Sequence, residues 1–209
     1  MLDQATLDRL WNFEDPKLSE QRFRDALADP TYNTDEKAEL ATQLGRAIGL
    51  QGRYEEADAL LDAIDGEAEP TVGVRILLER GRLLNSSGHA AMAVPLFEQV
   101  AELGDHLGEE FLVVDALLML AAADSAHAES WTRSALEYAS TAHDPHTRRW
   151  MAGLHNSLGW MLHAAGRFTP ALVEFQLAEQ WAEQAGTRAE QQQAREAILA
   201  CELDMAAAE

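Results

Sequence analysis

The sequence is poor in cysteine, proline and basic residues, and each scarcity excludes a class of protein. A single cysteine, Cys201, rules out a disulfide within the chain. Six prolines among 209 residues leave long stretches free to form helices. Only 16 lysines and arginines stand against 36 aspartates and glutamates, which gives a net charge of −20. Because no basic block could bind a phosphate backbone or an anionic membrane surface, we expect neither nucleic acid nor membrane as a partner.

Long hydrophobic runs are also missing. The longest, residues 111–123, is interrupted by Asp115 and is too short to cross a bilayer. The first ten residues, MLDQATLDRL, have neither the positive start nor the apolar stretch of a secretory signal. These features predict a cytoplasmic protein.

Motifs that carry catalysis are equally scarce. The sequence has no glycine-rich phosphate loop, no nucleophile elbow and no zincin spacing of histidines. Residues 143–146, His-Asp-Pro-His, place two imidazoles and a carboxylate in one turn, but a loop that caps a helix explains them better than a metal site. Cys201 falls on the apolar stripe of the last predicted helix, where we expect packing and not reactivity. We therefore predict no enzyme, no metal site and no cofactor.

Helix-forming residues are what the sequence has in abundance. Alanine, leucine, glutamate and glutamine dominate, and 47% of all residues are apolar. Apolar residues recur at helical spacing, and no segment sustains the alternation of a strand. The sequence predicts an all-α fold.

The most informative stretch is residues 154–178, where small and large residues follow a regular spacing. Its members are Leu158, Gly159, Leu162, Gly166, Phe168, Ala171, Phe175 and Ala178. Such spacing predicts two antiparallel helices, with small residues where the helices approach closely and large ones where they fill space. The same offsets recur around Gly45 and Gly81 and, more weakly, around Ala116.

This pattern resembles the tetratricopeptide repeat. The resemblance implies a right-handed superhelical solenoid of antiparallel helix pairs, forming one continuous domain. Four pairs are expected in residues 35–186, at 38–70, 74–104, 109–142 and 146–186. Residues 1–34 would form capping helices or a degenerate repeat, and residues 187–209 a C-terminal capping helix.

The last pair is out of step with the others, because Gly159 follows Ala116 by 43 residues. Longer paired helices, similar to the extended repeats of kinesin light chains, would absorb the excess.

The resemblance also implies a binding site in a concave groove lined by the first helix of each pair. The positions expected to face it are Arg46, Arg82, Asn85, Val113, Leu117, Leu120, Asn156 and Trp160. Arg46 and Arg82 are equivalent in adjacent repeats and could flank one carboxylate or straddle an extended peptide. An ion pair within the chain, with Glu79 or another acidic neighbour, is an equal alternative.

The helix predicted over residues 111–123 is apolar nearly all round, which is typical of a helix buried on every side. The solenoid closing over it, an apolar floor for a ligand and contact with a second subunit are three explanations that remain open. Trp160, one repeat further on, is of a type enriched in binding hot spots.

The predicted function is binding of a protein or peptide in this groove, without catalysis. Aliphatic and aromatic groups would supply affinity, and the arginines and asparagines would orient the ligand. Two alternatives are a regulatory module that binds a small signal or peptide and switches a partner, and a structural module that self-associates as a homo-oligomer. The partner's identity is open.

Overall fold

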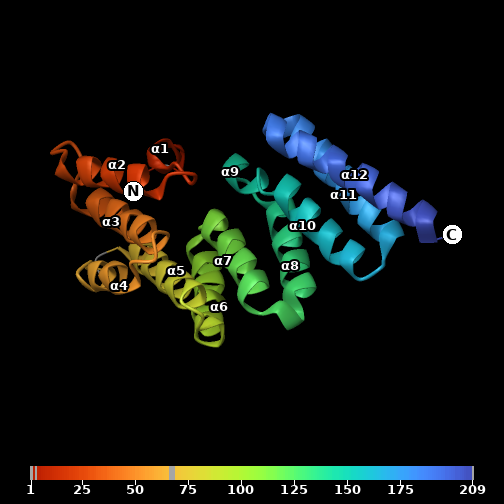
Figure 1. The fold of residues 1–209 in the computed structure, drawn as a ribbon. Helices are drawn as coiled ribbons and strands as arrows, with labels where there is room; N and C mark the ends of the chain where they lie inside the picture. Colours follow the sequence, from red (N-terminus) through yellow and green to blue (C-terminus); the bar gives the residue numbers. More distant parts are fainter. Residues whose placement is uncertain (1, 3, 66–68, 209) are drawn as a thin grey trace. The chain divides into compact units, whose positions relative to one another are not determined.

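The computed structural model describes residues 2, 4–65 and 69–208, and every regular element in these ranges is a helix (Figure 1). The all-α prediction is therefore confirmed. The chain divides into two compact units, an N-terminal unit, Met1–Asp124, and a C-terminal unit, Ser125–Glu209. Among the described helices, no single one combines the length and apolar character needed to cross a bilayer.

In the N-terminal unit each helix packs against the next one in the chain, and α3 also packs against α5. Its helices are α1 (Gln4–Leu10), α2 (Pro16–Ala28), α3 (Thr34–Gly49), α4 (Tyr54–Asp62), α5 (Pro70–Ser86), α6 (Ala90–Leu107) and α7 (Glu110–Ala123). Local sequence sets several helix starts. Asp15 caps α2 by accepting a hydrogen bond from the Leu18 N–H, and Asn33 and Glu36 form a reciprocal capping box on α3.

In the C-terminal unit α10 packs against α8, α11 and α12, and α11 packs against α12. Its elements are the 3₁₀ turn η1 (Ser125–His127), α8 (Ala128–Thr141), α9 (Pro145–Arg148), α10 (Met151–Ala164), α11 (Phe168–Ala185) and α12 (Arg188–Ala208). Asp144 caps α9 by accepting hydrogen bonds from the N–H groups of His146 and Thr147. The interpretation of residues 143–146 as a helix cap is thus confirmed.

The helix boundaries correct two expectations. The first two predicted pairs, 38–70 and 74–104, occupy Thr34–Asp62 and Pro70–Leu107, because Pro70 begins α5 and does not end the preceding helix. The extra residues between Ala116 and Gly159 do not lengthen the helices on either side. The helices α8 and α10 have 14 residues each, against 18 in α6. The extra residues make up the short helix α9 and the segments around it.

The paired helices approach each other where a glycine of the first meets a large side chain of the second. A Cβ atom on Gly81 would lie 2.4 Å from Cε1 of Phe97, and one on Gly159 would lie 2.5 Å from Cε1 of Phe175. Both rings are fully buried. Gly45 meets Leu61 in the same way, with a separation of 3.0 Å. In all three pairs the large residue follows the glycine by sixteen positions, as the sequence spacing predicts.

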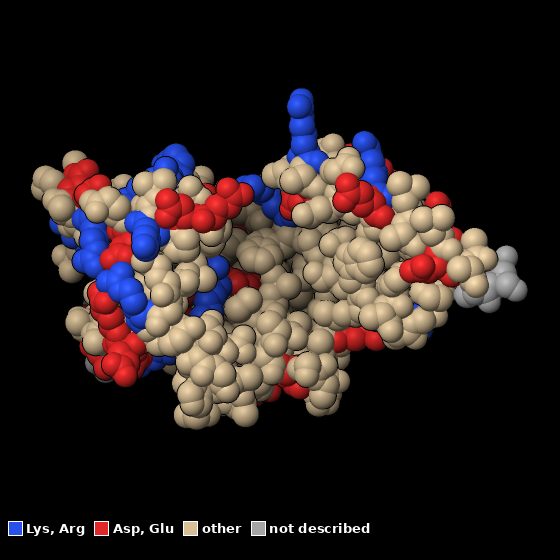
Figure 2. Space-filling model, viewed as in Figure 1, with Lys and Arg blue, Asp and Glu red and all other residues tan. Residues whose placement is uncertain are grey.

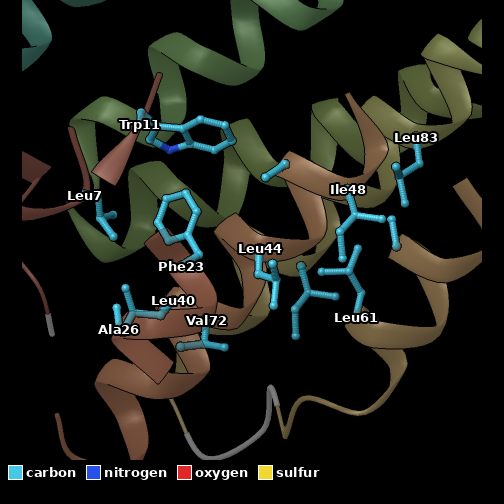
Figure 3. Packing of buried hydrophobic residues seen from close by; sticks show 13 residues of the cluster. Leu7, Trp11, Phe23, Ala26, Leu40, Leu44, Ile48, Leu61, Val72 and Leu83 are labelled. Atoms are coloured by element: carbon cyan, nitrogen blue, oxygen red, sulfur yellow. The ribbon is translucent and has the colours of Figure 1, made fainter. Parts of the chain in front are cut away.

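The core of the N-terminal unit draws on α1 to α5 (Figure 3). Trp11, just after α1, packs edge-to-face on Phe23 of α2, and its indole N–H donates to Oε1 of Gln43 at 3.1 Å. Leu40 and Leu44 of α3 complete this part of the core. The first two helices are therefore integral to the unit.

The core of the C-terminal unit lies between α10, α11 and α12 and includes Cys201. The thiol is fully buried, with Sγ 3.4 Å from the carbonyl oxygen of Phe168. Burial raises the pKa of Cys201, as do Asp204 and Glu202. The expectation that this cysteine packs is confirmed.

Glu20 of α2 ties that helix to the turn between α3 and α4. Its carboxylate accepts hydrogen bonds from Gln51 Nε2, Arg53 Nη1 and Arg24 Nη2, each at 2.7 Å. Burial by itself would raise the pKa of Glu20, but the three donors outweigh it and lower this pKa to about 2.

Two alanine substitutions in α10 test the close approach at Gly159. Gly159→Ala is expected to lower the free energy of unfolding by about 1–3 kcal/mol, because the buried Phe175 ring has to shift. Gly153→Ala, an exposed position with nothing within 4 Å of the added Cβ, should raise it by about 0.5–1 kcal/mol through helix propensity. Urea unfolding of both variants measures the difference, and equal effects would show that the pairing of α10 with α11 is wrong.

Acid unfolding tests the role of Glu20. Because its folded-state pKa of about 2 lies below the ordinary 4.5, the ionised form stabilises the fold above pH 4.5 and loses this effect as the pH falls toward 2. Glu20→Gln should therefore flatten the dependence of unfolding free energy on pH in this window. Glu98→Gln, at an exposed carboxylate of α6, should leave the dependence as in the original protein.

Candidate functional site

The predicted site residues fall in both units, and three of them meet in one cavity of the N-terminal unit. Arg46 of α3 and Arg82 and Asn85 of α5 line a cavity of about 190 Å³. Leu50, Leu83 and Met119 supply its apolar wall. The expected proximity of Arg46 and Arg82 follows from the packing of α3 against α5.

Arg82 is held by two carboxylates of the chain itself. Its guanidinium pairs with Glu79 one turn earlier on α5, and Nη2 lies 2.5 Å from Oδ2 of Asp115 on α7. Both carboxylates are buried. Burial alone would lower the pKa of Arg82, but Asp115 and Glu79 raise it above its ordinary value. Of the two roles left open for this arginine, the ion pair with Glu79 is the one that the structure contains.

Asp115 is fixed in its charged form by the same contact. Burial would raise its pKa, but the adjacent Arg82, and then Arg46, lower it below the ordinary value. Arg75 of α5 makes a second buried pair, with Nη2 3.0 Å from Oε1 of Glu39 on α3. We call the six residues Glu39, Arg46, Arg75, Glu79, Arg82 and Asp115 the charged cluster. Elsewhere on the N-terminal unit, basic and acidic side chains lie next to one another on the surface (Figure 2).

Arg46 differs from the other two arginines of the charged cluster because no carboxylate pairs with it among the described residues. Its guanidinium lies over the rings of Trp11 and Phe13, at 5.1 and 5.2 Å from their centroids. The two rings are stacked 4.6 Å apart. Its Nε atom is buried and has no hydrogen-bond partner, which is also true of the Nε atom of Arg75. Burial, and after it the charge of Arg82, lower the pKa of Arg46.

The apolar residues predicted for the groove are buried in the structure. Val113, Leu117 and Leu120 are exposed by 3%, 8% and 1%. The phase of α7 explains this placement, because Asp115 and Met119, one turn apart, form the stripe that faces Arg82 and the cavity. Of the described residues of α7, Met119 lines the cavity wall, and the three predicted residues pack elsewhere.

Asn156 and Trp160 lie one turn apart on α10 in the C-terminal unit. Trp160 is 43% exposed and makes edge-to-face contacts with Phe175 at 5.0 Å and His163 at 5.3 Å. Asn156 is half-buried, and its Oδ1 atom is buried without a hydrogen-bond partner. Trp160 therefore exposes part of its ring to solvent while the ring also packs against Phe175 and His163.

Sequence reasoning missed two parts of the cavity's surroundings. The contact of Asp115 could have been predicted, because Asp115 is the one charge inside an apolar stretch and a buried charge needs a partner. The contacts of Trp11 and Phe13 with Arg46 could not, because they join segments more than thirty residues apart.

Comparison with known proteins identifies the fold alone. No family model and no curated protein matches the sequence. Among solved structures, the chain is similar to BtubC (BKLC) from P. vanneervenii, with a TM-score of 0.66 and 17% identity. The similarity covers 95% of this chain and 84% of that one. The chain thus belongs to the all-α class, with a fold similar to that of BtubC.

Arginine substitutions in α5 test the role of Arg82 in the fold. Arg82→Gln leaves Glu79 and Asp115 buried without their cation, so the free energy of unfolding should fall by about 3–5 kcal/mol. Arg80→Gln removes ion pairs to the exposed Asp58 and Asp62 and should cost less than about 1 kcal/mol. Thermal or urea unfolding of both variants decides whether the charged cluster supports the fold as described.

Proposed function

We propose that this chain is a helical solenoid of the tetratricopeptide type that binds a protein or peptide segment in the cavity beside Arg46, without catalysis. Three helix pairs with glycine-to-large contacts at one constant offset support the repeat. Their turns support it too, since Gly52, Gly88 and Gly166 all have positive φ values, between 72° and 87°. We further propose that the protein acts in the cytoplasm.

The observation that carries the proposed function is the unused hydrogen-bonding capacity of Arg46. A buried polar group without a partner costs free energy, and a charged one costs more. The Trp11 and Phe13 rings attract the positive charge of Arg46. They do not accept hydrogen bonds from N–H groups that point outward in the plane of the guanidinium. Glu79 and Asp115 act on Arg46 through their charge, but both pair with Arg82, and neither forms an ion pair with Arg46 among the described residues. Arg46 thus lacks a paired carboxylate. A ligand can supply one.

The cavity wall indicates the rest of the ligand. Leu50, Leu83 and Met119 favour an aliphatic part, and the amide of Asn85 can both donate to and accept from a peptide backbone. Leu50 is 51% exposed, so the cavity opens beside an apolar surface. An acidic side chain next to an aliphatic residue fits these features, with the carboxylate at Arg46.

A pair of small probes tests this assignment. Acetyl-Leu-Glu-amide should shift the NMR resonances of residues around the cavity, whereas acetyl-Leu-Gln-amide should bind about tenfold more weakly or not at all, because a hydrogen bond to a charged group is lost. Arg46→Gln should abolish this preference while the protein remains folded, as no ion pair is broken. Arg9→Gln, at an exposed arginine of α1, is the matched control and should keep it. Equal shifts with both probes, or no shifts in the cavity, would remove Arg46 as the recognition residue.

A further inference from the structure

A second cavity of about 420 Å³ lies between α4, α5 and α6 in the N-terminal unit. We call it the α4–α6 groove. Its floor is apolar, with Leu83 and Leu84 from α5, Leu96 from α6 and Tyr54 from α4. The hydroxyl of Tyr54 donates to the carbonyl of Ser86 at 3.1 Å, which fixes this wall of the groove.

The groove uses a different face of α5 from the cavity at Arg46. Arg80, Leu84 and Ser87 follow one another at helical spacing and line the groove, whereas Arg82 and Asn85 line the other cavity. On a helix with 3.6 residues per turn these two sets point in nearly opposite directions. The two cavities share Leu83 but no charged side chain, so the charges that an occupant of the groove meets differ from those at Arg46.

One rim of the groove is acidic. Glu55, Asp58 and Asp62 lie on a single stripe of α4 and are all exposed. The one cation that lines the groove, Arg80, pairs with Asp58 at 3.5 Å and also with Asp62. Glu55 makes no ion pair among the described residues. Among the described residues that line the groove, three carboxylates stand against one guanidinium, so the rim carries an excess of negative charge.

Apolar surface continues on α6 beyond the groove. Met92 precedes Leu96, a lining residue, by one turn of α6 and is 60% exposed. The groove thus combines an apolar floor with an acidic rim.

We propose that the α4–α6 groove binds a basic segment of a partner protein. An aliphatic or aromatic side chain of that segment enters the floor between Leu84 and Leu96. Lysine or arginine side chains on either side of it meet Glu55, Asp58 and Asp62. This charge complementarity selects a basic partner over a neutral or acidic one, and makes the affinity fall as salt rises.

A labelled synthetic amphipathic peptide of leucine and lysine is the probe, with its leucine–glutamate counterpart as a control for charge. The basic peptide should bind, and it should shift NMR resonances of α4, α5 and α6 around the groove. Leu84→Lys should weaken binding at least about tenfold, because it removes an apolar contact and adds a like charge. Asp58→Asn with Asp62→Asn should weaken it about two- to fivefold for each carboxylate.

Matched variants separate the groove from general attraction to an acidic protein. Glu98→Gln with Glu102→Gln removes two exposed carboxylates from the far side of α6 and should leave the affinity unchanged, as should Arg46→Gln. Equal weakening by the Glu98 and Glu102 pair, or binding of the acidic peptide, would mean that no groove-specific site exists. Concentration-dependent self-association that Leu84→Lys abolishes would overturn the proposal in favour of a second copy as occupant. Loss of peptide binding in Arg46→Gln would assign the basic peptide to the other cavity.

Discussion

The close approach of helices at glycine positions is the constraint on which the rest of the N-terminal unit depends. Gly45 and Gly81 admit Leu61 and Phe97 within each helix pair, and Gly49 admits Leu83 between neighbouring pairs. A Cβ atom on Gly49 would lie 2.4 Å from Cδ2 of Leu83, so with alanine at this position the Leu83 side chain would have to shift. Because α3 and α5 lie this close, Arg46 and Arg82 border the same cavity. The spacing that builds the fold also brings Arg46 and Arg82 together.

The ion pairs of the charged cluster are distributed unevenly among its three arginines. Arg82 engages two carboxylates and Arg75 engages one, while Arg46 is left with aromatic rings alone. Removing one partner of a buried ion pair is strongly destabilising, because the remaining charge is left in the interior without compensation. The paired residues are therefore parts of the fold, whereas Arg46 is the cation of the cluster that no ion pair holds among the described residues.

Much of this could be predicted from sequence, and the exceptions have a common cause. The offsets around Gly45, Gly81 and Gly159 predict the helix pairs because they depend on local spacing alone. The meeting of Arg46 with Arg82 follows from the same regularity. The rotation of α7 about its axis cannot be predicted in this way. A helix that is apolar nearly all round has no pattern that shows which of its faces lies at the cavity. Val113, Leu117 and Leu120 were thus expected at the groove, while the structure presents Met119 there. Partners distant in sequence, such as Asp115 for Arg82 or Trp11 for Arg46, depend on packing that no local pattern specifies.

Helix α5 lines both cavities and is held by its neighbours in the N-terminal unit. It packs against α3, α4, α6 and α7, so a large movement of α5 would disrupt four helix contacts at once. Leu83, buried at 8% exposure, lines both cavities and separates them. Side chains held in this way lose little freedom on binding, which favours affinity from a small contact area. Among the described residues, the two faces of α5 thus carry different charges: a cavity with Arg46, which makes no ion pair, and a groove with three carboxylates against Arg80. This difference in charge, and not shape alone, separates the two cavities.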